Sequence, residues 1–184
     1  TMVKLHTNQL VDASDTIVRG IITEVWTEED AKGIVWTRAQ LEVSEVFKGN
    51  RTQNAYVIDQ MGGQFGGNTT TVAGRAQFSP GEEGVFFLEQ FRSGRITTVG
   101  LSQGKFTLRL DPYSREMIVQ RYASGTATGY DHRFIPLPAE KDRLFLVDLV
   151  DSIEKRVAAG WDGQPIPGAS RERLERINRK EVAQ

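Results

Sequence analysis

One stretch of the sequence has the residue spacing of a catalytic nucleophile. Residues 100–104 read G-L-S-Q-G, which matches the G-x-S-x-G pattern with Ser102 at its centre. In hydrolases that serine occupies a strained turn from a strand into a helix, where a histidine can take its proton. Here residues 105–110 alternate between polar and apolar and predict another strand. Only His132 follows the serine, and no acidic residue between the two stands at an obvious strand end. We therefore predict a glycine-flanked turn and no catalytic residue.

Two tryptophans form a second candidate site. Trp26 and Trp36 lie at equal distances from Ala31 in a predicted turn, so we expect them to face each other across a hairpin. Aromatic pairs of this kind usually stabilise the sheet, but they can also stack on a sugar, a base or a peptide side chain. We expect a structural clamp and keep Trp36 and Trp26 as candidate ligand-binding residues.

The glycine-rich segment 62–68 is a third candidate. It lacks the G-x-G-x-x-G spacing of a dinucleotide site, and no helical pattern follows it. Glycines let a backbone approach a ligand closely, so Gly63 and Gly66 are candidate ligand-binding residues. We favour the interpretation that this segment only connects two strands.

Composition excludes several classes of function. The 184 residues include no cysteine, which removes disulfides, thiolate metal sites and cysteine nucleophiles, and the two histidines cannot form a multi-histidine metal site. We predict no cofactor and no metal. The net charge of -1 gives no overall attraction to nucleic acid, so no nucleic-acid partner is expected. No apolar run approaches the roughly 20 residues of a spanning helix, so no transmembrane segment is expected.

The elements that must position these residues are mostly strands. A short helix is predicted at 7–14, and the two faces of 16–26 are both apolar, as in a covered central strand. Residues 34–47 alternate and complete a long hairpin with it. Further strands are predicted at 55–61, 85–91, 95–101, 105–110 and 116–122. Beyond an irregular segment at 123–131, helices are predicted at 139–159 and from Ser170 onward.

This order, strands first and helices last, predicts an α+β fold that is mainly β. We expect an antiparallel OB-like closed barrel with a short N-terminal helix and two C-terminal helices. Residues 1–135 would form the barrel domain, and 136–184 a helical appendage packed on it through Leu146, Val150 and Ile153.

Four segments resemble a family of uncharacterised bacterial exported proteins. They are LVDASDTIVRG at 10–20, VSEVFKG at 43–49, FSPGEEGVFFL at 78–88 and VGLSQGKF at 99–106. Their arrangement is also similar to the OB-like barrel of the netrin-like and metalloprotease-inhibitor modules. The resemblance implies this barrel and an extracytoplasmic, periplasmic or secreted location. The inhibitors chelate zinc through an N-terminal cysteine, which this chain lacks, so their chemistry is not implied.

We therefore expect a non-enzymatic extracytoplasmic module that binds an unknown protein or small ligand. Two alternatives stay open. One is a serine hydrolase that uses Ser102, and the other is an oligosaccharide- or oligonucleotide-binding OB-type module centred on Trp36.

Overall fold

The computed structural model describes residues 3–122 and 129–182. The described elements are β-rich and run from a short N-terminal helix, through ten strands, to two C-terminal helices. In chain order they are α1 (Thr7–Ala13), β1 (Thr16–Glu29), β2 (Val35–Lys48), β3 (Ala55–Met61), β4 (Gly63–Phe65), β5 (Asn68–Thr70), β6 (Glu83–Gln90), β7 (Ile96–Thr98), the 3-10 helix η1 (Leu101–Gly104), β8 (Lys105–Leu110), β9 (Met117–Arg121), β10 (Arg143–Phe145), α2 (Leu146–Ala159) and α3 (Arg171–Val182). The mainly β, α+β class is confirmed.

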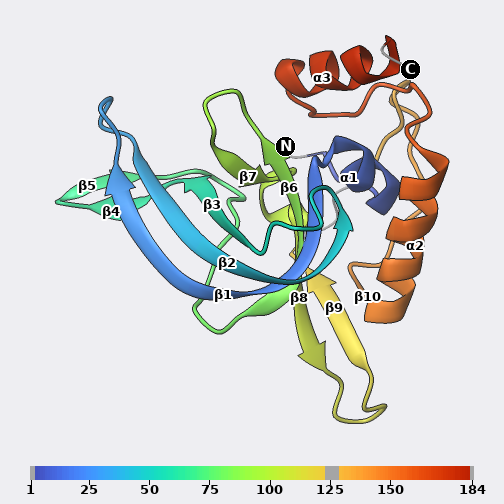
Figure 1. Ribbon diagram of the computed structural model, residues 1–184, viewed down its shortest axis with the longest axis horizontal. Helices are drawn as coiled ribbons and strands as arrows, with labels where there is room; N and C mark the ends of the chain where they lie inside the picture. The colour runs from blue at the N-terminus through green and yellow to red at the C-terminus, as the bar shows by residue number, and fades with distance from the viewer. Residues whose placement is uncertain (1–2, 123–128, 183–184) are drawn as a thin grey trace.

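The main sheet is an open half-barrel (Figure 1). Its strand order is β10-β9-β8-β6-β1-β2-β3, with β7 also paired to β6, and every pairing is antiparallel. The predicted closed barrel is wrong, because no backbone ladder joins β3 to β7 among the described strands. The two strands face each other through side chains instead. We call the line between them the seam.

The long hairpin of β1 and β2 produces the curl. Its register shifts at three places, after Ile17, Arg19 and Ile22, and such β-bulges bend and twist a sheet. Gly20 lies at one shift, where a Cβ atom would stand only 2.2 Å from the Glu42 carbonyl oxygen. The backbones of β1 and β2 therefore approach each other closely at this glycine.

The sheet has an apolar cluster on each face. Val18, Ile22, Phe86 and Leu88 belong to the cluster inside the half-barrel. Neighbouring residues on the same two strands point the other way, toward α1 and α2, and form the second cluster with them; these are Ile17, Val85 and Phe87. The prediction that the first strand is covered on both faces is confirmed only for its first part, because Ile21 is 39% exposed and no residue of β1 beyond Ile22 is buried.

Helix α2 packs on the second cluster, as predicted, but it begins later than expected. Leu149 and Ile153 are fully buried, while Leu146 and Val150 are partly buried against the same cluster. Residues 139–145 are not helical, because Arg143–Phe145 add an edge strand, β10, to β9. Part of the predicted helical appendage therefore belongs to the sheet.

Helix α3 docks through charged side chains. Ser170 Oγ accepts a hydrogen bond from the Arg173 backbone N–H at 3.0 Å, so Ser170 caps the helix that was predicted from this residue onward. The Arg173 side chain is 6% exposed and contacts the Asp15 carboxylate, and Arg176 Nη2 donates to Asp15 Oδ2 at 2.9 Å. The sequence pattern did not predict this docking through arginines.

Within the described ranges, no helix has the length and apolar character needed to cross a membrane.

Candidate functional site

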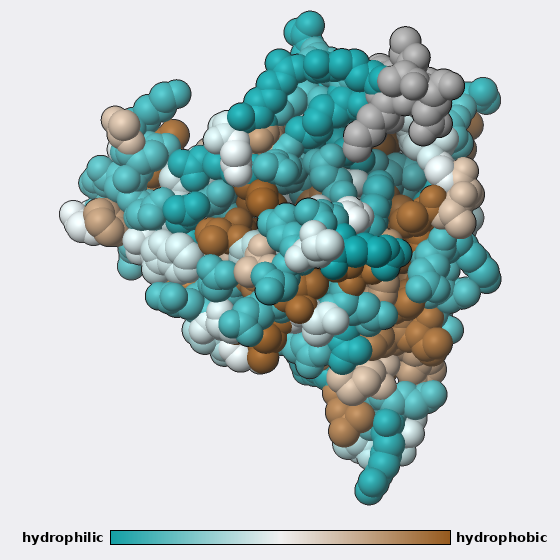
Figure 2. Space-filling view, viewed as in Figure 1, coloured by the Kyte–Doolittle hydropathy of each residue, from teal (hydrophilic) through white to brown (hydrophobic). Residues whose placement is uncertain are grey.

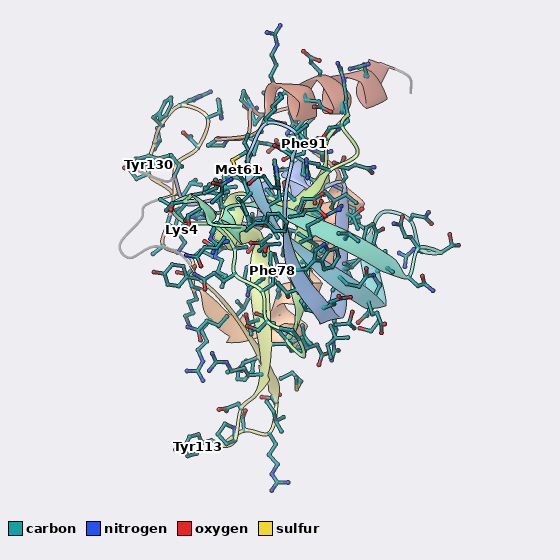
Figure 3. All side chains as sticks on the ribbon, turned by 90° about the vertical axis from the view of Figure 1, so that its left-hand side faces the viewer. Lys4, Met61, Phe78, Phe91, Tyr113 and Tyr130 are labelled. Atoms are coloured by element: carbon teal, nitrogen blue, oxygen red, sulfur yellow. The ribbon has the colours of Figure 1, made fainter. Side chains whose placement is uncertain are left out.

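The seam between β3 and β7 opens into a pocket of about 460 Å³, which we call the seam groove. Residues from five parts of the chain line it: Trp36, Gln60, Met61, Val72, Phe91, Ser93, Arg95, Thr97, Thr98, Leu101 and Glu172. Figure 3 shows Met61 and Phe91 below α3, and Figure 2 shows apolar side chains gathered over this part of the sheet. Met61 is 36% exposed although its side chain is large and apolar.

Trp36, at the start of β2, is held on two sides. Its indole Nε1–H donates to Asp30 Oδ2 at 2.9 Å. This bond, together with the backbone N–H groups of Ile34 and Lys32, holds the pKa of Asp30 below its ordinary value. The Arg95 guanidinium lies over the indole ring, 3.8 Å from its centroid, in a cation–π contact. One face of the Trp36 ring is therefore already covered.

The predicted register, in which the two tryptophans face each other, is wrong by two residues. Trp36 stands opposite Glu28, and Trp26 stands opposite Arg38. Because the shift is an even number of residues, both rings remain on one face of the hairpin, in a diagonal relation. Arg38 lies 5.8 Å from the centroid of the Trp26 ring. Arginine–tryptophan contacts thus replace the expected aromatic clamp, and of the two tryptophans only Trp36 lines the groove.

Polar side chains fasten the seam where the backbone does not. Asp59 on β3 is almost fully buried, with Arg38 Nε 2.8 Å and Arg95 Nη1 3.4 Å from its Oδ1. Thr98 Oγ1 on β7 lies 2.7 Å from the Leu101 carbonyl oxygen, to which it donates, and 3.5 Å from Gln60 Oε1. These ion pairs and hydrogen bonds join side chains of β3 to side chains around β7, although Arg38 Nε and Asp59 Oδ1 lack a partner in hydrogen-bond geometry.

Sequence reasoning missed Met61, Phe91 and Arg95 as groove residues. Each comes from a strand end or turn, and they meet only because the sheet curls. The one local signal was the apolar Met61 placed directly before the glycine-rich segment.

The two candidate glycines have conformational roles in the structure. The segment predicted as a simple connection forms a hairpin of β4 and β5, whose two-residue turn is Gly66 and Gly67 with φ of 52° and 86°. These angles are typical of a type I′ turn, which favours glycine. Gly63 packs against the long hairpin, where a Cβ atom would lie 2.9 Å from Thr37 Oγ1. Neither residue lines the seam groove.

Ser102 is buried in η1 and lies outside the seam groove. Its Oγ donates to the Tyr122 carbonyl oxygen at 3.2 Å. Strand β8 follows η1 directly, as predicted, so the strand-to-helix elbow of a hydrolase is not formed. Among the described residues no histidine is hydrogen-bonded to Ser102. No group of three or more metal-ligating side chains occurs in the described part of the chain either.

Comparison with protein-family models and with curated proteins finds no match to this chain. The resemblance to exported and netrin-like proteins accordingly remains a prediction.

Proposed function

We propose that the protein is a non-enzymatic binding module that receives apolar side chains of a partner protein in the seam groove. The observation that carries the proposal is the combination of apolar walls with three polar groups, on Trp36, Thr98 and Arg95, that already have partners in the protein. Met61, Val72, Phe91 and Leu101 supply the walls. Covering such surface is favourable by about 25 cal/mol per Å² of apolar area.

The state of the polar groups favours an apolar ligand over a sugar. A sugar needs hydrogen-bonding groups that are free to turn toward it, since unpaired polar groups in an interface are costly. In the groove the Trp36 N–H, the Thr98 hydroxyl and the Arg95 guanidinium all have partners in the protein. The cation–π contact on Trp36 also removes one face from sugar or base stacking. The oligosaccharide and oligonucleotide alternatives therefore receive no support from this groove.

The OB-like relationship and an extracytoplasmic location remain parts of the proposal. Both are supported by the sequence resemblance alone.

Selection of short random peptides displayed on phage, with the purified protein as target, tests the proposal. We expect enrichment of peptides that carry large apolar side chains, and a synthetic copy should bind saturably. Met61→Lys would place a charge in the apolar wall and should weaken binding about tenfold or more. Phe65→Lys is the matched control, because Phe65 is 46% exposed and lies outside the groove.

Equal affinity of the peptide for the parent and Met61→Lys proteins would contradict the proposal. Failure to enrich any apolar peptide would contradict it as well.

A further inference from the structure

A second, larger pocket of about 750 Å³ lies under the chain segment that joins β5 to β6. We call it the cationic pocket. It is lined by Thr71, Val72, Gly74, Arg75, Ala76 and Gln77 of that segment, and by Ser102, Lys105, Thr107, Arg109, Gln120, Arg121 and Tyr122. Four of these residues are basic and none is acidic. Clefts lined by one sign of charge concentrate counter-ions.

Two of the four cations are neutralised by carboxylates close to the pocket. The Arg121 Nε and Nη2 atoms bind Asp142 at 2.7 Å and Glu140 at 3.0 Å. Lys105 binds Glu82. Neither residue therefore needs an external anion.

The other two cations, Arg75 and Arg109, have no carboxylate within ion-pair distance among the described residues. Arg75 Nη1 donates only to uncharged oxygens, Thr37 Oγ1 and the Gly62 carbonyl, each at 3.1 Å. Its Nε and Nη2 make no hydrogen bond to the described part of the protein. Arg109 is exposed, and its side chain makes no hydrogen bond or ion pair to the described residues. The pocket thus carries two positive charges that the described protein does not compensate.

The position of Arg75 is fixed before any ligand arrives. Its two bonds through Nη1 hold the guanidinium, while Nε and Nη2 keep free donors. The segment that carries Arg75 is itself tethered, because the Ser102 N–H donates to the Gly74 carbonyl at 3.0 Å and Lys105 Nζ bonds the Gln77 carbonyl. Donors held in this way lose little freedom on binding, which favours affinity.

Strand β8 presents the opposite wall. Lys105, Thr107 and Arg109 alternate along it and so lie on one face. Gln120 stands opposite Thr107 on β9 and adds an amide to the same wall. Guanidinium and amide donors around one cavity match the acceptor oxygens of an oxyanion.

We infer that the cationic pocket is a binding site for a small ligand with a phosphate, sulfate or carboxylate group, held by Arg75 and Arg109. Val72 is the only residue that also lines the seam groove, and neither arginine does. The inference therefore stands independently of the proposed partner site.

Titration of the ¹⁵N-labelled protein with sodium phosphate, sodium sulfate and sodium citrate, each at constant ionic strength against sodium chloride, tests the inference by NMR. At least one of the three anions should produce saturable shifts centred on the amides of residues 74–77 and 105–109. The order of the three affinities then identifies the preferred oxyanion. Arg109→Gln should raise the dissociation constant about tenfold, as expected for loss of one charged hydrogen-bonding partner.

Arg75→Gln should weaken binding similarly. Because this variant also loses the two hydrogen bonds of Arg75 and can disturb the segment, Arg109→Gln provides the independent test. Arg51→Gln is the control, since it removes the same charge from the exposed turn between β2 and β3. The inference is overturned if no anion gives saturable shifts at this pocket. It is also overturned if Arg109→Gln and Arg51→Gln bind the anion as tightly as the parent protein.

Discussion

Removal of the Asp15 side chain should release helix α3 while leaving the rest of the fold in place. Asp15 Oδ2 accepts hydrogen bonds from Arg176 Nη2 and from the Gln90 backbone N–H, each at 2.9 Å, and Oδ1 contacts Arg173. The Arg173 side chain is 6% exposed, and its Nη2 donates at 2.9 Å to the Ser14 carbonyl. Asp15 is therefore the main anion that keeps a buried guanidinium in place.

The magnitude follows from this burial. Removing one partner of a buried ion pair costs about 3–5 kcal/mol, because the other charge is left unpaired. In Asp15→Ala that charge can escape into water if α3 leaves the surface. The exposed pairs of Arg92 with Glu172 and Glu175 contribute at most about 1 kcal/mol each. Glu89 still contacts Ser170 and Arg176, but it does not pair with Arg173. We expect the docking equilibrium to shift by a factor on the order of a hundred or more.

Limited proteolysis with trypsin measures this shift, since α3 contains four arginines, and hydrogen exchange of the α3 amides gives a second reading. Cleavage within α3 should become much faster in Asp15→Ala, while cleavage in the sheet stays slow. Glu175→Ala, which removes a carboxylate from an exposed pair, is the control and should change little. Equal cleavage rates for the parent and Asp15→Ala proteins would refute the reasoning, as would equal acceleration in both variants.

Three further predictions concern stability and pH. Ile153→Asp should destabilise the fold by several kcal/mol in denaturant melts, because it buries an unpaired charge in the cluster between α2 and the sheet, whereas an unchanged melt would contradict that packing. Burial raises the pKa of Asp142, but the hydrogen bonds from Arg121 and Lys4 lower it by more, so the net shift is downward. The folding free energy that the ionised Asp142 contributes is therefore present at neutral pH and is lost as the pH falls through and below the ordinary aspartate pKa. Arg121→Met should reduce this acid-dependent loss of stability. The Trp36 indole lowers the pKa of Asp30, so tryptophan emission should change only below the ordinary aspartate range, and Asp30→Asn should abolish that change.

The local elements could be predicted from the sequence, because their signals are local. Alternation in 34–47 and two apolar faces in 16–26 indicated the long hairpin, and the spacing of Leu146, Val150 and Ile153 indicated the side of α2 that packs on the sheet. The β4–β5 hairpin was missed because its strands are three residues each and its composition is that of a loop. The register was missed because the five-residue turn between Glu29 and Val35 is centred on Lys32 and not on Ala31, which places Trp36 opposite Glu28.

The site itself was not predictable in the same way. The seam groove forms where β3 and β7, more than thirty residues apart, meet on a sheet that curls without closing. The sequence pattern indicates which face of a strand is buried, but it does not indicate whether the two edges of the sheet will pair. Arg173 likewise belongs to a helix rich in charged residues, and only the tertiary structure places it beside Asp15.

The ε-methyl NMR signal of Met61 tests the central claim most directly. The protein contains three methionines, and Met61 lies in the seam groove while Met117 lines a separate small pocket beside α2. With ¹³C-methyl-methionine labelling, a selected apolar peptide should shift the Met61 signal saturably and leave the Met117 signal in place. A peptide that binds without shifting Met61, or that shifts Met117 instead, would contradict the assignment of the seam groove as the partner site.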